Sequence, residues 1–285
     1  MSHRKSGKGV VWLAWFVGLM LMAMAGVATA ADKAALAGLN GQLRVGMECA
    51  YAPNNWQEAA ASDTNVPIEN VPGGYAQGYD VQFARIIADH LGVKLVIVKM
   101  DWDGLIEALN QGQIDAIIAG MMDTPERRQA INFSETYSHI PTEYAMLINE
   151  GSRYQGAKSI QDFSGASVLG QKDTALDSVI DQIQGVNHLP AVASVPDMLA
   201  RLRENACDAV VVSVEDSASY IAATPTFRLV RFEGENGFVL PATGSCVGIR
   251  RTDDALLLLV NEAVTSVDRE TRVAMWDAAS TSQPR

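Results

Sequence analysis

The chain has 285 residues, in which 33 Asp and Glu outnumber 22 Lys and Arg and give a net charge of −11 at pH 7. A surface this acidic repels nucleic acid and anionic lipid, so we expect neither as a partner. The length allows one large domain or two of ordinary size, each with its own hydrophobic core.

The first thirty residues carry the pattern of a secretory signal peptide. Basic residues at positions 4, 5 and 8 precede an apolar run over 10–24, and small residues follow over 28–30. The apolar run is short for a membrane-spanning helix, so a permanent anchor is the weaker alternative. We therefore expect export to the periplasm, cleavage of residues 1–30 and no membrane insertion of the mature chain.

Three cysteines, Cys49, Cys207 and Cys246, lie far apart and lack the spacing of a metal-binding pair. One disulfide and three buried thiols are both compatible with the sequence in an oxidising compartment. The four histidines are scattered. We therefore expect neither a metal site nor a cofactor.

Short β-rich runs alternate with helical patterns along the chain, which predicts an α/β fold with mainly parallel sheets. In chain order, the elements expected in the first half are strands over 43–47, 93–98 and 114–119 and helices over 80–91 and 101–112. Asp80 and Asp101 are expected to cap the two helices. Strand–helix–strand units of this kind give parallel pairing.

A polar, Gly-containing stretch over 149–156 follows an extended segment over 142–148. This change is typical of passage from one compact unit to another. The elements expected beyond it are strands over 166–169, 208–212 and 246–249 and helices after Thr174 and over 196–204, 216–222 and 253–267. The second half therefore predicts another α/β unit.

Five sequence blocks follow one another in order: Gly78-Tyr79-Asp80-Val81, DWDGLI over 101–106, DAIIAGM over 115–121, Thr124-Pro125-Glu126-Arg127 and Asn132-Phe133-Ser134. Together they resemble the polar-amino-acid-binding proteins of bacterial ABC importers, solute-binding family 3, which include lysine/arginine/ornithine-binding proteins. Further likeness over 166–177, 207–220 and 247–254 extends the resemblance to nearly the whole mature chain.

The resemblance implies a type II periplasmic-binding-protein-like fold, a Venus flytrap of two α/β lobes joined by two hinge strands. Lobe 1 would comprise 31–140 and 241–285, and lobe 2 would comprise 141–240. It also implies capture of an amino acid by closure of the cleft and delivery to a membrane permease. The hinge is expected near 137–144 and 238–247, and the protein is expected to be a monomer.

Arg127 is the residue expected to hold the ligand's carboxylate. A guanidinium donates two parallel hydrogen bonds to a carboxylate and stays charged. Thr124 and Pro125 favour a helix start there, whose free N–H groups would face the same anion. Without the resemblance, a surface charge is the alternative, and we assign that role to the neighbouring Arg128.

Thr174 occupies the matching place in lobe 2, before a helix, and the resemblance assigns it to the same carboxylate. A simple helix cap is the alternative. Asp173 stands where the family commonly has Gly, and its charge would repel an anion. Tyr51 and Trp102 match the family's aromatic walls and offer a cation–π face, with a role in the core as the alternative.

Glu48 matches the acidic residue that meets the distal cationic group in the lysine/arginine/ornithine-binding relatives. A carboxylate there would select a cationic ligand and reject an acidic one, so a cationic amino acid is favoured. A solvated glutamate at the end of a strand is the alternative.

Two positions depart from the family pattern. Ser213 stands where the ammonium-binding Asp is expected, and a hydroxyl cannot offset an ammonium's charge. We assign that role to Glu215, with Asp216 as the alternative, and a ligand without a free α-amino group stays open. Met122 replaces the usual Ser or Thr of the carboxylate pocket. Gly120 is a further residue expected to bind the ligand.

Two rival functions use the same scaffold. An exported enzyme, for example a cyclohexadienyl-dehydratase-like lyase, would need a poised acid or base, and Glu48 or Glu215 could serve. The sequence contains neither a GxSxG elbow nor an HExxH motif. A receptor's sensor lobe would need a transmembrane or signalling segment after Arg285, which we do not expect. We therefore expect a binding protein and no enzyme.

Overall fold

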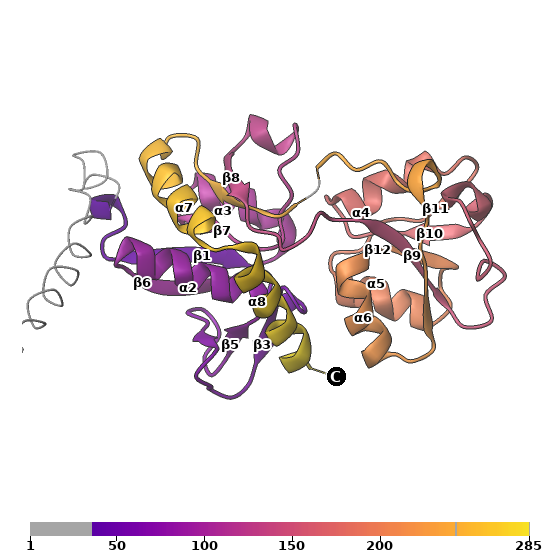
Figure 1. Cartoon of the computed structure of the whole chain (residues 1–285), viewed down its shortest axis with the longest axis horizontal. Coiled ribbons are helices and arrows are strands. Elements are labelled where there is room, and N and C mark those ends of the chain that lie inside the picture. The colour runs from indigo at the N-terminus through magenta and orange to yellow at the C-terminus, as the bar shows by residue number, and fades with distance from the viewer. Residues whose placement is uncertain (1–35, 243, 285) are drawn as a thin grey trace, which may run out of the picture.

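The computed structural model describes residues 36–242 and 244–284, so the signal peptide predicted over 1–30 lies outside the described residues. The described chain forms two lobes, each built on a five-stranded sheet with helices packed on it (Figure 1). This confirms the predicted two-lobed α/β fold. No helix in the described ranges is long and apolar enough to cross a membrane.

The lobe 1 sheet has the strand order β6-β1-β7-β14-β8. Its strands are β1 (Gln42–Met47), β6 (Lys94–Lys99), β7 (Ala116–Ile117), β8 (Asn132–Thr136) and β14 (Cys246–Ile249). β1 pairs in parallel with β6 and β7, whereas β14 is antiparallel to β7 and β8. The late strand therefore returns to lobe 1 after the chain has built all of lobe 2.

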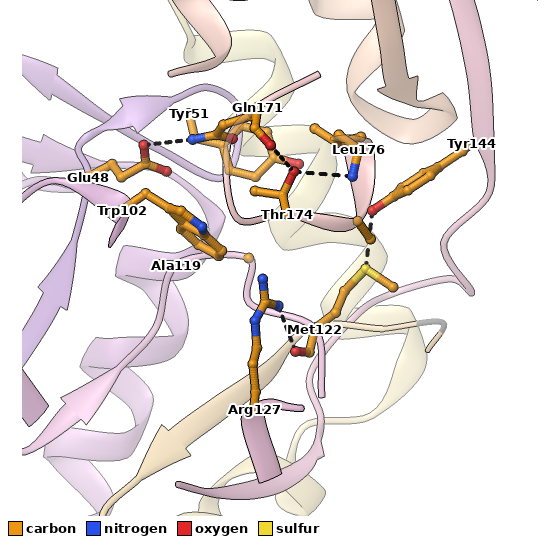
Figure 2. A pocket seen from close by; sticks show the side chains of 12 residues that line it. Glu48, Tyr51, Trp102, Ala119, Met122, Arg127, Tyr144, Gln171, Thr174 and Leu176 are labelled. Atoms are coloured by element: carbon orange, nitrogen blue, oxygen red, sulfur yellow. Dashed lines mark hydrogen bonds between the residues drawn. The ribbon is translucent and has the colours of Figure 1, made fainter. Parts of the chain in front are cut away.

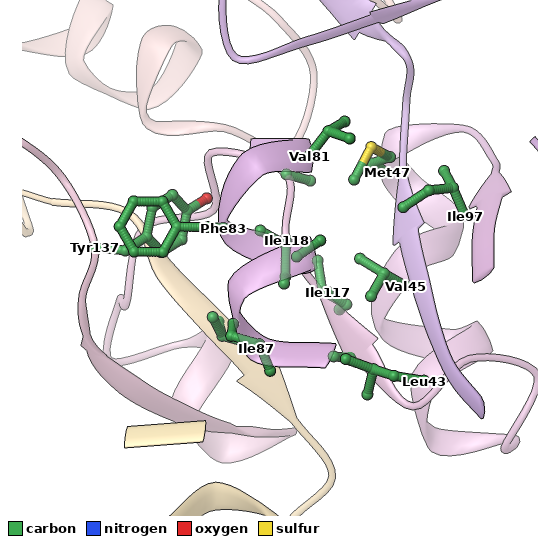
Figure 3. Packing of buried hydrophobic residues seen from close by; sticks show 14 of the residues in the cluster. Leu43, Val45, Met47, Val81, Phe83, Ile87, Ile97, Ile117, Ile118 and Tyr137 are labelled. Atoms are coloured by element: carbon green, nitrogen blue, oxygen red, sulfur yellow. The ribbon is translucent and has the colours of Figure 1, made fainter. Parts of the chain in front are cut away.

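The helices of lobe 1 are α2 (Tyr79–Leu91), α3 (Leu105–Asn110), α7 (Asp254–Ser266) and α8 (Arg269–Ser282). Ile87 on α2 belongs to the same buried cluster as Val45 of β1 and Ile117 of β7. The Phe83 ring lies beside the Tyr137 ring instead, as Figure 3 shows. α2 ends at Gly92 in the left-handed conformation, φ 66°, as its position predicts. Helix α8 was not expected from the sequence.

The predicted cap at Asp80 is wrong. Gly78 precedes the helix, and no side chain caps it. The Asp80 carboxylate is fully buried instead, and it accepts hydrogen bonds from Asn55 Nδ2 at 2.7 Å and from the Tyr137 hydroxyl at 2.7 Å. Asp101 precedes a 3-10 turn, η1 (Trp102–Gly104), and its side chain does not cap it either.

A small antiparallel sheet, absent from the sequence prediction, extends lobe 1 towards lobe 2. Its order is β2-β3-β5-β4, with β2 (Ala50–Tyr51), β3 (Asn55–Glu58), β4 (Val66–Pro67) and β5 (Tyr75–Gln77). It places Tyr51, Asn54 and Asn55 within hydrogen-bonding distance of buried carboxylates.

The lobe 2 sheet has the order β11-β10-β12-β9-β13. Its elements are β9 (Tyr144–Asn149), β10 (Ser167–Leu169), β11 (Asn187–His188), β12 (Ala209–Ser213), β13 (Phe227–Val230), α4 (Ala175–Ser178), α5 (Val195–Arg203) and α6 (Val214–Ala223). The remaining turns are 3-10 helices over Arg127–Gln129, Ile160–Phe163, Val179–Gln182 and Gly234–Asn236. Each lobe has its own cluster of buried apolar side chains.

Two connections join the lobes, one from β8 to β9 and one from β13 to β14, and they lie side by side where they leave lobe 1. Tyr137 donates its N–H to the Ser245 carbonyl at 2.9 Å, and Ser245 donates to the Ser138 hydroxyl at 2.7 Å. Cys49, Cys207 and Cys246 are buried and unpaired, so the three-thiol alternative describes the fold.

Asp115 lies just before β7 and forms hydrogen bonds with residues at the neighbouring strands β1 and β14, which gives a test of the fold. Its carboxylate, 2 % exposed, accepts from Arg44 at three donors within 3.0 Å and from Arg250 at 3.4 Å. Asp115→Ala leaves these donors without their acceptor, so the free energy of unfolding should fall by about 3 kcal/mol in urea titration. The exposed control Asp89→Ala should lose at most about 0.5 kcal/mol. Equal losses in the two variants would contradict this role.

Candidate functional site

A pocket lies between the lobes and is lined by most of the predicted site residues (Figure 2). Those that line it are Glu48, Tyr51, Trp102, Gly120, Met122, Arg127 and Thr174, joined by Ala119, Tyr144, Gln171, Ala175 and Leu176. The pocket encloses about 40 Å³. This is far below the 300–1,000 Å³ typical of ligand sites, so the pocket in this arrangement of the lobes is too small for an amino acid.

Arg127 presents a positive charge without a carboxylate partner. Its Nη1 donates to the Met122 carbonyl and its Nη2 to the Asp173 carbonyl, each at 2.9 Å. Within the described residues, no carboxylate oxygen lies within 4.0 Å of the guanidinium. Burial lowers the pKa of Arg127, but an arginine stays protonated. The site therefore holds a cation that is free to pair with a carboxylate.

The segment that carries Arg127 differs from the expected helix start. It is a 3-10 turn over Arg127–Gln129, and the Thr124 hydroxyl accepts the Arg127 N–H at 3.4 Å. A turn of three residues does not supply the dipole of a helix. The guanidinium alone therefore carries the positive charge on this side, and it stacks 5.1 Å from the centre of the Trp102 ring.

Thr174 caps α4, as its position predicts. Its hydroxyl accepts from the Leu176 N–H at 3.1 Å and donates to the Gln171 carbonyl at 2.7 Å. The neighbouring Asp173 has a positive φ of 58° and turns its carbonyl towards Arg127 and Trp102. Its carboxylate instead lies 3.6 Å from Lys172, which weakens the repulsion expected for an anion.

Glu48 is 7 % exposed, and its carboxylate accepts from Gln171 Nε2 at 3.0 Å. Burial and repulsion by Asp101, Asp103 and Asp80 raise the pKa of Glu48 to about 7, against the Gln171 hydrogen bond, which lowers it. A cation next to this carboxylate would favour its ionised form and so lower its pKa again. The solvated-glutamate alternative does not describe this buried side chain.

Gln171 was missed by the sequence prediction. It also donates to the Ala193 carbonyl at 3.1 Å, which fixes the amide across from Glu48. The signal that could have found it is its place just after β10, because ligand-binding side chains gather at the carboxyl ends of parallel strands. Tyr144, the first residue of β9, was also missed. Its hydroxyl donates a hydrogen bond to Met122 Sδ at 3.2 Å.

The close packing of Gly120 explains why a glycine stands there. Its φ is 65°, and a Cβ added to it would lie 2.8 Å from Tyr51 Cε1. Its N–H donates to the Tyr137 hydroxyl at 3.0 Å. A larger residue would push Tyr51 out of the pocket wall.

Ser213 and Glu215 do not line the pocket. Ser213 lies at the end of β12 with its hydroxyl buried and without a hydrogen-bond partner in the described structure. Glu215 points instead at His139, with Oε2 3.9 Å from Nδ1. Glu215 and Asp216 are successive residues of α6, which begins at Val214. Because successive side chains of a helix point about 100° apart, the two carboxylates face different surroundings.

Asp216, the alternative to Glu215, faces lobe 1. It is fully buried, and its carboxylate accepts from the Tyr51 hydroxyl at 2.6 Å and from Asn54 Nδ2 at 3.0 Å. Burial, and then the nearby Glu215, raise its pKa well above the usual range. Asp216 therefore joins the lobes behind Tyr51 without lining the pocket.

The lobes are closed on one another. Six of the hydrogen bonds or ion pairs that cross between them are Tyr51–Asp216, Asn54–Asp216, Trp102–Asp173, Arg127–Asp173, Gln171–Glu48 and Lys172–Asp103. Four of these six involve a residue that lines the pocket on the lobe 1 side. The same side chains therefore form the pocket and hold it shut.

Comparison of the sequence with known protein families gives one match. The sequence matches the bacterial extracellular solute-binding proteins, family 3, over residues 43–275. The chain therefore belongs to this family of extracytoplasmic binding proteins.

Individual relatives are 23 % to 28 % identical in sequence to this chain. A probable histidine-binding protein of Campylobacter jejuni is 28 % identical over 234 residues, which cover 80 % of this chain and 82 % of that protein. The arginine-bound form of truncated ArgBP from T. maritima has a TM-score of 0.67 at 27 % identity, covering 81 % and 98 %. An arginine-bound amino acid ABC transporter substrate-binding protein of Streptococcus pneumoniae reaches 0.74 at 23 % identity, covering 87 % and 98 %, which shows the fold alone.

Glu48 makes the stability of the protein depend on pH. Its pKa is about 4.3 in an unfolded chain and about 7 here, so in that window the folded state holds a proton that the unfolded state lacks. The free energy of unfolding therefore falls as pH rises through the window and stays lower above it. Glu48→Gln removes this term and should gain on the order of 2 kcal/mol over wild type between pH 4 and pH 8, measured by urea titration.

The comparison with wild type is needed because His139 changes the free energy of unfolding with pH in the opposite direction to Glu48. Burial lowers the pKa of His139 to about 4, so the folded state loses stability as pH falls below about 6.5. The exposed control Glu235→Gln should follow the wild-type profile. A Glu48→Gln difference that stays constant across the whole pH range would show that Glu48 is not held neutral by its surroundings.

Proposed function

We propose that this protein captures a cationic amino acid and delivers it to the membrane permease of an amino acid ABC importer. One observation carries the proposal: a single pocket between the lobes contains a guanidinium without a carboxylate partner, Arg127, and a buried carboxylate without a cationic partner, Glu48. A ligand with a carboxylate and a distal cation satisfies both groups when it replaces their contacts with neutral groups.

The aromatic residues of the pocket support the same ligand class. Trp102 and Tyr51 line the pocket together with Glu48 and Arg127. They offer apolar area to a methylene chain and a ring face to a cation, worth about 0.5–2 kcal/mol. The arginine bound to the T. maritima relative agrees with a cationic ligand. The C. jejuni relative is named for histidine, whose side chain is cationic only below about pH 6.5.

The proposed mechanism is a two-state closure. The ligand binds in the open cleft, and contacts from both lobes then favour the closed state. We propose that the lobes comprise 31–140 with 241–285 and 141–240, and that the paired connections at Tyr137 and Ser245 act as the hinge. The interlobe hydrogen bonds at Asp173 and Asp216 support a closed state held by contacts from both lobes.

The location and assembly follow from the same proposal. Membership of an extracellular family supports export, and we propose that residues 1–30 direct the chain to the periplasm and are removed. We propose a monomeric binding protein that carries out no reaction. Of the two acid–base candidates for an enzyme, only Glu48 lines the pocket, and the relatives are binding proteins.

A thermal-shift screen of the mature protein tests the ligand class. Arginine, lysine, ornithine and histidine should include at least one ligand that raises the melting temperature, because binding to the folded state stabilises it by mass action. At pH 8, where Glu48 is ionised, glutamate, aspartate and small dicarboxylates should leave it unchanged, because Glu48 repels them. Stabilisation by the acidic ligands alone would overturn the assignment of Glu48.

Arg127→Met tests the carboxylate assignment. Loss of two charge-assisted hydrogen bonds should weaken binding of the cationic amino acid found in the screen by about 100-fold or more in calorimetry. Arg128→Met is the matched control, because Arg128 is exposed and pairs with Asp123. If Arg127→Met binds within threefold of wild type, Arg127 does not hold the carboxylate.

A further inference from the structure

A second cavity adjoins the pocket, and we call it the outer chamber. It encloses about 270 Å³ and shares two lining residues with the pocket, Glu48 and Trp102. Arg127 lines the pocket alone. Both lobes line the outer chamber, lobe 1 through residues 99–103 and lobe 2 through Lys172 and the start of α5. The chamber therefore lies at the Glu48 end of the site, where the distal cation of the ligand is expected.

The outer chamber stays open in the arrangement in which the pocket is nearly filled. A cavity needs only about 10–15 Å³ to hold one water molecule, so the chamber has room for several atoms beyond the distal nitrogen of a ligand. Asp101, Asp103 and Asp197 line it and are exposed to solvent. Groups that enter the chamber therefore keep part of their hydration and meet no close-packed wall.

The outer chamber has an excess of negative charge. Among its lining residues, carboxylates outnumber ammonium groups by four to two. Lys172 is already paired with Asp103 at 3.1 Å. In the part of the chain that the structure describes, no Lys, Arg or His nitrogen lies within 4.0 Å of the carboxylates of Glu48, Asp101 and Asp197. The chamber therefore attracts a cation and any cationic group that carries substituents into it.

Glu48 is the buried charge at the boundary of the two cavities. The side chain is 7 % exposed, its Oε1 accepts from Gln171 Nε2 at 3.0 Å, and no described residue donates to its Oε2. The remaining ammonium group of the chamber, Lys99 Nζ, donates to Gln57 on β3 at 2.8 Å and leaves Glu48 without a cation. A ligand cation that pairs with Glu48 therefore lies where the cavities meet, and substituents on that cation have the outer chamber beside them.

We propose that the outer chamber is a second subsite that receives substituents on the distal cation, so that the protein binds α-amino acids whose cationic side chain is N-methylated. This rests on the proposed roles of Arg127 and Glu48, which hold the carboxylate and the distal cation. Methylation keeps the positive charge but adds bulk, which a close-fitting pocket rejects. The chamber supplies room and negative charge, and Trp102 offers a ring face to a quaternary ammonium.

Calorimetry of the mature protein with two matched pairs tests the proposal. The pairs are arginine with Nω,Nω-dimethyl-arginine, and lysine with trimethyl-lysine methylated on its side-chain nitrogen, all at pH 8, above the pKa of about 7 for Glu48. The methylated member of at least one pair should bind within tenfold of its parent. Methylated ligands that bind more than tenfold more weakly than their parents in both pairs overturn the inference and leave the proposed function intact.

Ala193→Trp tests whether the methyl groups lie in the outer chamber. Ala193 is exposed, and it lines the chamber but not the pocket, so an indole there fills the chamber without entering the core. The ratio of methylated to parent affinity should fall at least fivefold relative to wild type. Ala206→Trp is the matched control, because Ala206 is exposed on lobe 2 and lines neither cavity. A smaller fall in Ala193→Trp, or an equal fall in the control, overturns the inference.

Two further outcomes concern the proposed function. Glu48→Gln should weaken both members of each pair at least tenfold, because it removes the partner of the distal cation. If the affinities do not change in this variant, Glu48 does not hold the distal cation, and the function and the inference both fail. If none of the four compounds binds to the wild type, the cationic ligand class is wrong and the inference falls with it.

Discussion

The charge of Arg127 is the constraint on which the site depends. The guanidinium lies between the lobes, bonds to two carbonyl oxygens and stacks on Trp102, but the described residues give it no carboxylate. A half-buried cation held only by neutral groups stays costly until an anion arrives. Because one of its carbonyl partners belongs to Asp173 in lobe 2, the same guanidinium couples the anion to closure of the lobes.

Three buried carboxylates, two between the lobes and one inside lobe 1, accept hydrogen bonds from neutral donors only. Glu48 accepts from Gln171, Asp216 from Tyr51 and Asn54, and Asp80 from Asn55 and Tyr137. Burial raises the pKa of each, to about 7 for Glu48 and about 6 for Asp80. Of the three, only Glu48 lines the pocket, so only Glu48 can recover its charge by contact with a ligand. Asp216 stabilises the closed arrangement because both its hydrogen-bond donors belong to lobe 1, whereas Asp80 accepts hydrogen bonds within lobe 1 alone.

Elements with clear periodicity were predicted well. The strand over 246–249 has the expected bounds, and α2 ends at Gly92 as expected. The small sheet was missed because strands of two to four residues are too short to show alternation, and α8 was missed because it buries few residues, among them Trp276. The helix expected at Thr124–Arg127 is only a 3-10 turn, and Asp80 lies in the interior because Asn55 and Tyr137 satisfy it there.

The sequence by itself determined the α/β class, the resemblance to a binding-protein family and the residue types of most of the pocket, because these depend on local periodicity and on ordered motifs. Only the tertiary structure decided which buried polar groups meet. Gln171 reaches Glu48, and Asp216 reaches Tyr51, across separations of 123 and 165 residues. Whether Glu215 or Asp216 faces lobe 1 depends on the rotation of α6 at the interface, which the packing of the two lobes fixes and no local pattern records.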